Sequence, residues 1–207
     1  GVDGLSPAPV TPEQRGEFAA QLAPIDGTID SEWTWSSVAE FYDWHRGRSI
    51  VDMGMYLGHS SVRRVVMGNL GRPASPEQIR EMCDVVRSEA RMTLGLSTGL
   101  IYNPAVYSDA QEIAALVRSF NEVKPGALFP HLRSESDQIL PSLDEVVTAA
   151  IDGGGGYCNE HSKIAGSRNW DKYNAISDKI ADASANIPTM ENMYPYPAGS
   201  TTGDTIF

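Results

Sequence analysis

The sequence predicts an α/β fold in which parallel strands alternate with helices. Three features predict it: clearly marked helix starts, short apolar runs between the helices, and a spacing of about 30 to 40 residues between successive runs. This spacing is typical of strand–helix units that build a parallel sheet. The residues alone leave open whether the sheet is open or closed into a barrel.

Hydroxyl side chains mark three of the expected helix starts. The segments 11–14 (TPEQ), 75–78 (SPEQ) and 108–111 (SDAQ) each fit a capping box, in which the hydroxyl caps the N3 amide and the N3 glutamine reaches back. Pro12 and Pro76 fall at the first helical position, where the N–H has no helical partner to lose. Helices are expected near residues 12–22, 36–46, 76–92, 109–122, 142–152 and 171–185.

Short apolar runs supply the expected strands. Each run lies between two expected helices and is short enough to be a strand rather than a helix. The strands are expected near residues 51–57, 93–97, 127–131, 155–160 and 187–193.

Composition and charge restrict the class of protein. The 207 residues are 41% hydrophobic and 21% charged, which is ordinary for a globular domain with a sizeable core. The net charge of −11 argues against nucleic acid or an anionic membrane surface as a partner. No apolar run approaches the roughly 20 residues of a membrane span. The two cysteines, Cys83 and Cys158, do not suggest a disulfide framework.

Two histidines stand where a parallel sheet carries its chemistry. His131 and His161 each follow a short apolar run and precede polar residues. The carboxyl ends of parallel strands hold the functional residues in such folds, and imidazole is the commonest metal ligand in proteins. The two side chains can therefore meet at one ion. Ordinary strand-end histidines are the alternative interpretation of the same residues.

Several segments together carry a resemblance to a known family. They are 94–104 (LGLSTGLIYNP), 131–135 (HLRSE), 161–163 (HSK) and 192–201 (NMYPYPAGST), with further matches in 1–9, 57–63 and 66–68. In this order they resemble the N-acyl-D-amino-acid deacylases, or D-aminoacylases, of the amidohydrolase superfamily. The resemblance implies a (β/α)8 TIM barrel of the metal-dependent amidohydrolase type. Residues 1–207 are then expected to form an internal part of that catalytic barrel, without its first and last strands.

The resemblance also implies a set of metal ligands. His131 and His161 match the two histidines that bind the tightly held zinc in the family, and Asp3 stands where the family has a cysteine. A carboxylate is a harder ligand than a thiolate but is competent for zinc, and its two oxygens can bridge two metals. We therefore expect zinc as the cofactor, with one or two ions. A turn aspartate before Gly4 is the alternative for Asp3.

Three further residues match positions that bind the substrate carboxylate in the family. They are Lys163, Tyr194 and Ser200. An ammonium and two hydroxyls can hold a carboxylate by charge-assisted hydrogen bonds. The alternative is a solvated lysine, a tyrosine packed between prolines and a loop serine. Asn192 replaces the aspartate of the family's D-x-Y-P-Y segment, and an amide cannot act as a carboxylate base.

Polar residues beside His131 have two possible roles. Arg133 and Glu135 could orient the metal ligands or could pair with each other on a loop. His59 also follows an expected strand, in a family segment but not at a metal position, and we expect it to be structural or to orient a metal ligand.

The function implied by the resemblance is zinc-dependent hydrolysis of the amide bond of N-acyl-D-amino acids. The expected partner is this small-molecule substrate, with no nucleic acid or membrane, and a cytoplasmic location. The superfamily's His-x-His pair and its last-strand aspartate do not occur in the sequence, so the chain by itself is expected to be inactive. A dihydroorotase-like or hydantoinase-like cyclic amidase is one alternative. A non-catalytic barrel that has lost its metal is the other, favoured by Asp3 and Asn192.

Overall fold

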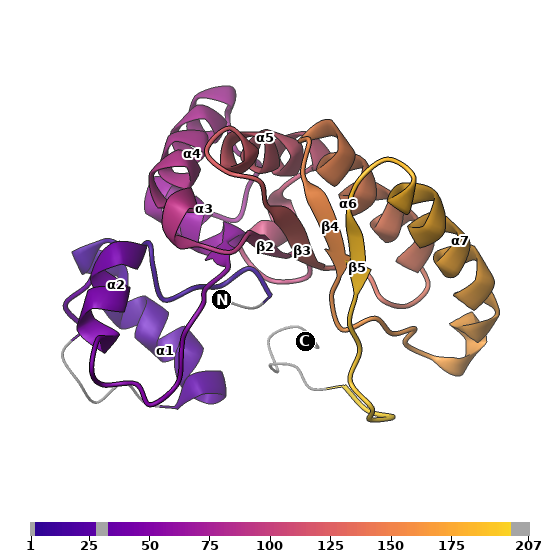
Figure 1. The fold of residues 1–207 in the computed structure, drawn as a ribbon, viewed down its shortest axis with the longest axis horizontal. Coiled ribbons are helices and arrows are strands. Elements are labelled where there is room, and N and C mark those ends of the chain that lie inside the picture. The colour runs from indigo at the N-terminus through magenta and orange to yellow at the C-terminus, as the bar shows by residue number, and fades with distance from the viewer. Residues whose placement is uncertain (1–2, 28–32, 200–207) are drawn as a thin grey trace.

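Five parallel strands lie at the centre of the molecule and follow one another across the sheet in chain order (Figure 1). The structure is a computed structural model that describes residues 3–27 and 33–199. The predicted alternation of parallel strands and helices is confirmed. The strands are β1 (Leu57–Gly58), β2 (Leu96–Gly99), β3 (Ala127–His131), β4 (Gly156–Asn159) and β5 (Thr189–Glu191).

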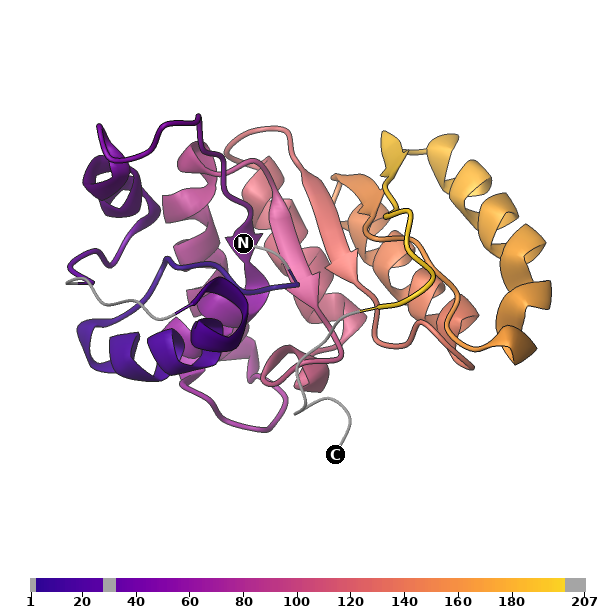
Figure 2. The same ribbon diagram turned by 90° about the horizontal axis from the view of Figure 1, so that it is seen from below.

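Helices cover one side of this sheet. Figures 1 and 2 show α3 to α7 as an outer layer that curves around the strands, while α1 and α2 form a separate group beside it. Among the described residues, no helix is both long and apolar enough to cross a membrane. The helices are α1 (Arg15–Asp26), α2 (Val38–His45), α3 (His59–Met67), α4 (Pro76–Glu89), α5 (Ala110–Asn121), α6 (Ile139–Asp152) and α7 (Tyr173–Ser184).

The core lies between the strands and the outer helices. Leu57, Leu96, Leu128 and Tyr157 come from four successive strands and are buried in one hydrophobic cluster with residues of α3 to α6. A second cluster holds Trp35 and the apolar face of α2. The main cluster fixes the strand register, and with it the edge at which the strands end.

The register brings the carboxyl ends of the strands to one edge. Gly99, the last residue of β2, is paired with His131, the last residue of β3. Asn159, the last residue of β4, is paired with Glu191 of β5. Residues that follow these strands therefore lie near one another although they are far apart in the sequence.

The structure differs from the elements expected from the sequence most clearly in a strand, a helix and a helix cap. The strand expected at 51–57 is reduced to Leu57–Gly58, and Val51 is exposed. The helix α3 was not expected, because His59, Arg63 and Arg64 lie among its few apolar residues, although Val62 and Met67 reach the core. The cap of α5 is Asp109 rather than Ser108: the Asp109 carboxylate accepts from the Glu112 N–H at 2.9 Å.

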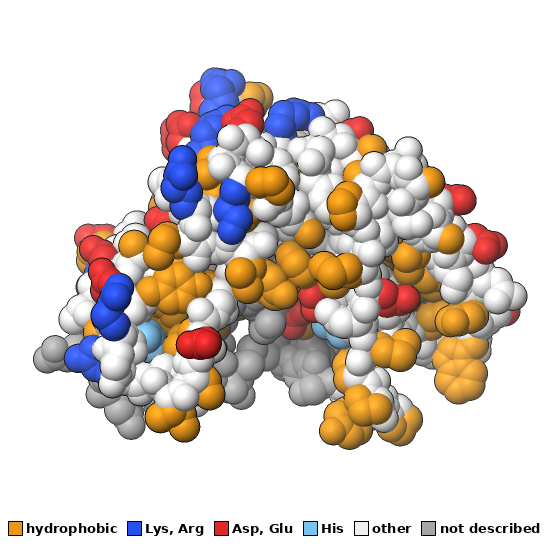
Figure 3. Space-filling view, viewed as in Figure 1, with side chains coloured by type: hydrophobic (Ala, Val, Ile, Leu, Met, Phe, Trp, Pro, Cys, Tyr) orange, Lys and Arg blue, Asp and Glu red, His pale blue; other side chains and the backbone are white. Residues whose placement is uncertain are grey.

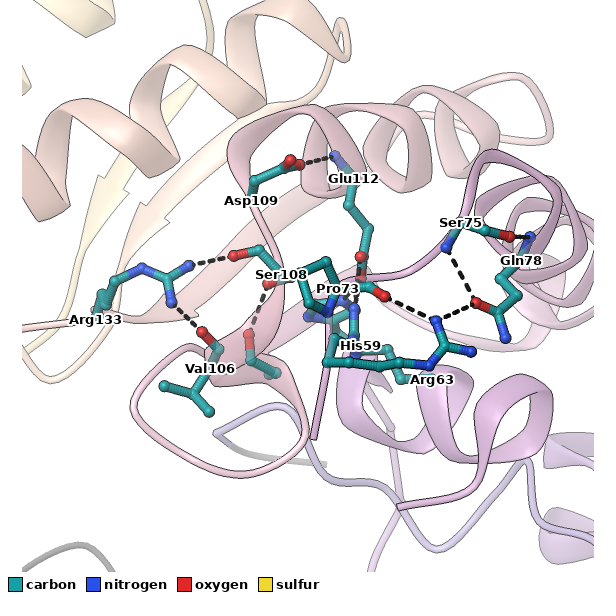
Figure 4. Close-up of polar contacts among 12 residues, drawn as sticks. His59, Arg63, Pro73, Ser75, Gln78, Val106, Ser108, Asp109, Glu112 and Arg133 are labelled. Atoms are coloured by element: carbon teal, nitrogen blue, oxygen red, sulfur yellow. Dashed lines mark hydrogen bonds and ion pairs between the residues drawn. The ribbon is translucent and has the colours of Figure 1, made fainter. Parts of the chain in front are cut away.

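Buried charges explain why α3 is polar and yet internal. His59 Nε2 lies 2.7 Å from Glu112 Oε1, and Arg63 Nη1 donates to both carboxylate oxygens at 2.6 and 2.5 Å. All three side chains are buried between α3 and α5, as Figure 4 shows. Burial raises the pKa of Glu112, but its contacts with His59 and Arg63 outweigh that effect and hold the pKa below the usual value. This agrees with the expected structural role of His59.

Candidate metal centre

Two imidazoles and a carboxylate meet at the carboxyl edge of the sheet. Asp3 Oδ1 lies 3.3 Å from His131 Nδ1 and 3.2 Å from His161 Nε2. One donor atom from each of the three residues lies within 4.8 Å of the other two. The structure therefore brings together the three residues that the sequence predicts as ligands, although they come from distant parts of the chain.

The strand ends position the two histidines. His131 is the last residue of β3, and its ring packs against the ring of His161 at a centroid distance of 4.6 Å. His161 lies in the turn after β4 with a φ of 35°, an uncommon backbone conformation for a residue other than glycine. Asn192 holds this turn, because its Oδ1 accepts from the His161 N–H at 2.6 Å. Asn192 thus has a structural role that a carboxylate oxygen could also fill.

A tight turn places Asp3 over the end of β2. Asp3 has a φ of 51°, and the next N–H, of Gly4, donates to Ser97 Oγ at 3.1 Å. The Gly4 carbonyl accepts from the Ser60 N–H at 2.8 Å. A Cβ atom at Gly99 would overlap the Asp3 carbonyl oxygen and lie 2.6 Å from its carbon. The turn can therefore approach β2 this closely only because residue 99 is a glycine.

The carboxylates perturb the titration of the site. For Asp3, burial raises the pKa, but hydrogen bonds to His131 and His161 outweigh it and place the pKa far below the usual range. For His161, burial lowers the pKa, but hydrogen bonds to Asp3 and Glu135 outweigh it and raise the pKa to about 9. The carboxylates of Asp3 and Glu135 therefore favour the protonated, positively charged form of the His161 ring.

The donor set fits a zinc ion. An ion about 2.0–2.1 Å from each ligand of a tetrahedron places neighbouring ligand atoms about 3.3 Å apart. The separations from Asp3 Oδ1 to His131 Nδ1 and His161 Nε2, 3.3 and 3.2 Å, agree with that geometry. Two neutral imidazoles and one carboxylate are also a ligand set that zinc accepts.

Glu135 and Arg133 do not pair with each other. Arg133 makes two hydrogen bonds to Glu145, at 2.9 and 2.8 Å, and also donates to the carbonyls of Val106 and Ser108 (Figure 4 shows the carbonyl contacts). Glu135 instead turns to the site, where its Oε1 lies 3.1 Å from His161 Nδ1. Of the two roles considered for these residues, mutual pairing is wrong.

Lys163 and Tyr194 lie beside the metal-binding group. Lys163 Nζ donates to Glu135 Oε1 at 2.6 Å and lies 5.7 Å from the centre of the Tyr194 ring. Ser200, the third residue predicted to bind substrate, is outside the described residues. In Figure 3 hydrophobic side chains gather on the segment that follows β5, where Met193 and Tyr196 are exposed.

A cavity of about 530 Å³ opens next to Lys163 and Glu135. This volume is within the range of small-molecule sites. Asp3, His131 and His161 are not among its lining residues, so the cavity adjoins the metal-binding group without enclosing it. Its apolar wall comes mainly from α6, α7 and the segment before α7, including Ile139, Leu143, Ile164, Trp170, Tyr173 and Ile176. Its polar wall includes Asn159, Glu160 and Glu191 from the ends of β4 and β5.

Comparison with known proteins finds several that are similar to this chain. No protein-family model matches the chain. A D-aminoacylase from Alcaligenes xylosoxydans xylosoxydans is 28% identical over 201 residues, which cover 96% of the chain and 40% of that relative. An N-acyl-D-aspartate deacylase from the same organism is 31% identical over 170 residues, covering 79% of the chain and 34% of that relative.

Solved structures agree. A D-aminoacylase variant in complex with copper chloride superposes with a TM-score of 0.83 at 25% identity, covering 96% of the chain and 41% of that structure. The chain is a homologue of the D-aminoacylases. An N-acyl-D-glutamate deacylase from Bordetella bronchiseptica, solved with zinc and a phosphonate inhibitor, has the same fold, with a TM-score of 0.82 at 24% identity over 95% of the chain and 41% of that structure.

These matches fix the fold class. The five parallel strands and their helices correspond to part of the D-aminoacylase barrel. The chain spans 40% of the length of the D-aminoacylase relative and 34% of the N-acyl-D-aspartate deacylase. The resemblance inferred from the short sequence segments is therefore confirmed.

Gly99 was not assigned to the site from the sequence, and the role of Glu135 was left open between orienting the ligands and pairing with Arg133. The close approach at Gly99 has no local signal beyond a glycine at the end of a strand. Glu135 stands four positions after His131, and that spacing was the one available sign that it could face the same site. Its contacts with His161 and Lys163 depend on the conformation of the turn that follows β4.

Proposed function

We propose that the chain forms part of the catalytic barrel of a zinc-dependent hydrolase. The substrate is an N-acyl-D-amino acid, and the products are a carboxylate and the free D-amino acid. One observation carries this proposal: Asp3, His131 and His161 converge beside the ammonium of Lys163 in a homologue of the D-aminoacylases.

Each residue has a role in this proposal. Asp3, His131 and His161 hold the zinc ion, which when bound would polarise the acyl carbonyl and activate water for its hydrolysis. Lys163, with the hydroxyls of Tyr194 and Ser200, binds the α-carboxylate of the substrate by charge-assisted hydrogen bonds. Holding that carboxylate next to the metal ligands orients the amide bond for attack.

Zinc content tests the metal site. The full-length protein is expected to bind zinc, and His131→Ala and Asp3→Ala are each expected to lose most of it, because both remove one of three donors. Elemental analysis of the purified proteins measures this. His45→Ala is the control, since His45 packs against Phe41 in α2 and lies outside the site. A wild-type protein without zinc would favour a barrel that has lost its metal.

Turnover completes this test. The zinc-loaded protein is expected to hydrolyse N-acetyl-D-amino acids, to lose activity with a chelator, and to regain it when zinc is added back. Zinc binding without any such turnover would point to another amide substrate, such as a cyclic amide.

Lys163→Met tests the carboxylate site. Loss of one charge-assisted hydrogen bond is expected to lower kcat/KM about 10- to 100-fold, largely through KM, with zinc still bound. The matched control is a substrate analogue that lacks the α-carboxylate, whose slow hydrolysis should be the same for the wild type and the variant. An equal loss on both substrates would remove Lys163 from the carboxylate site.

A further inference from the structure

The carboxylate of Glu135 lies between the proposed metal ligands and the proposed carboxylate-binding residue. Its Oε1 is 3.1 Å from His161 Nδ1 and 2.6 Å from Lys163 Nζ. We propose that Glu135 is a positioning residue that joins the zinc site to the substrate-carboxylate site, by accepting from both groups through one oxygen. This inference rests on the proposed function and assigns to Glu135 a role that the function itself does not require.

Glu135 lies near a different ring nitrogen of each histidine, Nδ1 of His161 and Nε2 of His131. His161 points Nε2 to Asp3 and Nδ1 to Glu135, whereas His131 points Nδ1 to Asp3 and places Nε2 3.8 Å from Glu135 Oε2. A neutral imidazole has one N–H and one lone pair. An acceptor at His161 Nδ1 keeps the proton there and leaves the Nε2 lone pair for a metal ion, as carboxylates behind metal-binding histidines do.

The contact with Lys163 follows from the same assignment. Lys163 Nζ also lies 2.9 Å from His161 Nδ1. When Nδ1 carries its proton, both atoms are donors, so the acceptor that they share is Glu135 Oε1. The carboxylate thereby fixes the ammonium beside the metal ligands. A second N–H of Lys163 donates to the His161 carbonyl at 3.3 Å, which leaves the third for a substrate.

The backbone of Glu135 is held independently of its side chain. The Glu135 carbonyl accepts from the Ala165 N–H at 2.7 Å, which ties the loop after β3 to the loop after β4. Arg133 has its own partners in Glu145 and two carbonyls. A change of the Glu135 carboxylate to an amide of the same size therefore removes the negative charge that strengthens the contacts with His161 and Lys163, while the loop keeps its anchors.

The experiment compares Glu135→Gln with Glu145→Gln in the full-length protein. Both carboxylates are largely buried, at 14% and 18% side-chain exposure, but Glu145 faces Arg133 and not the site. Glu135→Gln is expected to weaken zinc binding about 10- to 100-fold in competition with a chelator. It is also expected to raise KM for an N-acetyl-D-amino acid at saturating zinc. Glu145→Gln should leave zinc affinity and KM unchanged even if it lowers stability.

A double variant separates the two contacts. In a Lys163→Met background, Glu135→Gln should still weaken zinc binding but should no longer raise KM, because the ammonium that it positions is gone. Zinc affinity within twofold of the wild type in a folded Glu135→Gln variant overturns the proposal, as does an equal effect of Glu145→Gln. Wild-type protein that binds zinc but does not turn over substrate rejects the proposed function, while the zinc titrations still decide the contact with His161. Wild-type protein without zinc overturns both.

Discussion

Replacing Glu112 by glutamine is expected to destabilise the fold by about 3–5 kcal/mol, the usual cost of breaking a buried ion pair from one side. The carboxylate accepts from Arg63 through both oxygens and contacts His59, and all three side chains are buried between α3 and α5. An amide keeps the shape but leaves the guanidinium without a compensating charge. Urea unfolding, followed by circular dichroism, measures the change in the free energy of unfolding.

Glu77→Gln is the matched control for this experiment. Glu77 is also a helical glutamate paired with an arginine, Arg80, but both side chains are exposed. Its replacement should change the free energy of unfolding by less than about 0.5 kcal/mol. A Glu112→Gln variant within that same range would show that the buried network contributes little.

The pH dependence of the Glu112 effect has a definite sign. The folded-state pKa of Glu112 lies below the value of 4.5 for a free glutamate side chain. A lowered folded-state pKa gives stability that is fully present above the unfolded pKa and is lost as the pH falls through the folded one. The difference in stability between wild type and Glu112→Gln should therefore narrow as the pH falls below about 4.5.

Replacing Gly99 by alanine is expected to weaken zinc binding at least tenfold and to destabilise the fold by about 1–3 kcal/mol. The added Cβ would meet the backbone of Asp3, which cannot rotate away as a side chain could. The turn must therefore move off the end of β2, and the Asp3 carboxylate moves with it. Zinc titration and urea unfolding of the full-length protein measure the two effects.

Gly16→Ala provides the control for the glycine experiment. Gly16 lies in α1, and a Cβ there would meet no atom within 4 Å. Alanine is favoured over glycine in a helix, so this variant should be as stable as the wild type or slightly more stable. A Gly99→Ala protein that binds zinc as tightly as the wild type would show that the Asp3 turn does not need this close approach.

The sequence predicted the strand–helix rhythm because capping residues and apolar runs are local signals. It missed α3 because residues such as His59 and Arg63 are buried for electrostatic reasons, which apolar periodicity cannot reveal. It predicted too long a first strand because Val51 and Met53 are exposed, although Met55 is buried and its carbonyl accepts from the Leu94 N–H. Both errors arise where tertiary contacts decide the outcome.

The candidate site also contains residues that could be predicted from the sequence and residues whose partners could not. His131 and His161 were predicted to meet because strand ends of a parallel sheet share an edge, and Asp3 was placed with them by resemblance. The partners of Arg133 and Glu135 could not be predicted, because Glu145 and Lys163 reach them from other segments of the chain. The residues next to Arg133 and Glu135 in the sequence give no information about contacts with segments that lie elsewhere in the chain.

The wide separation of Asp3 and His161 along the chain has a thermodynamic consequence. The two residues stand 158 positions apart, so an unfolded chain rarely brings them together. An ion that needs both residues as ligands binds the folded chain and hardly binds the unfolded chain. Its binding free energy therefore adds to the free energy of folding. At a free concentration of 100 times its dissociation constant, such an ion would contribute about 2.7 kcal/mol. The bound ion would then cross-link Asp3, near the first residue, to His161, which follows β4. The fraction of the protein that is folded would therefore depend on the free zinc concentration.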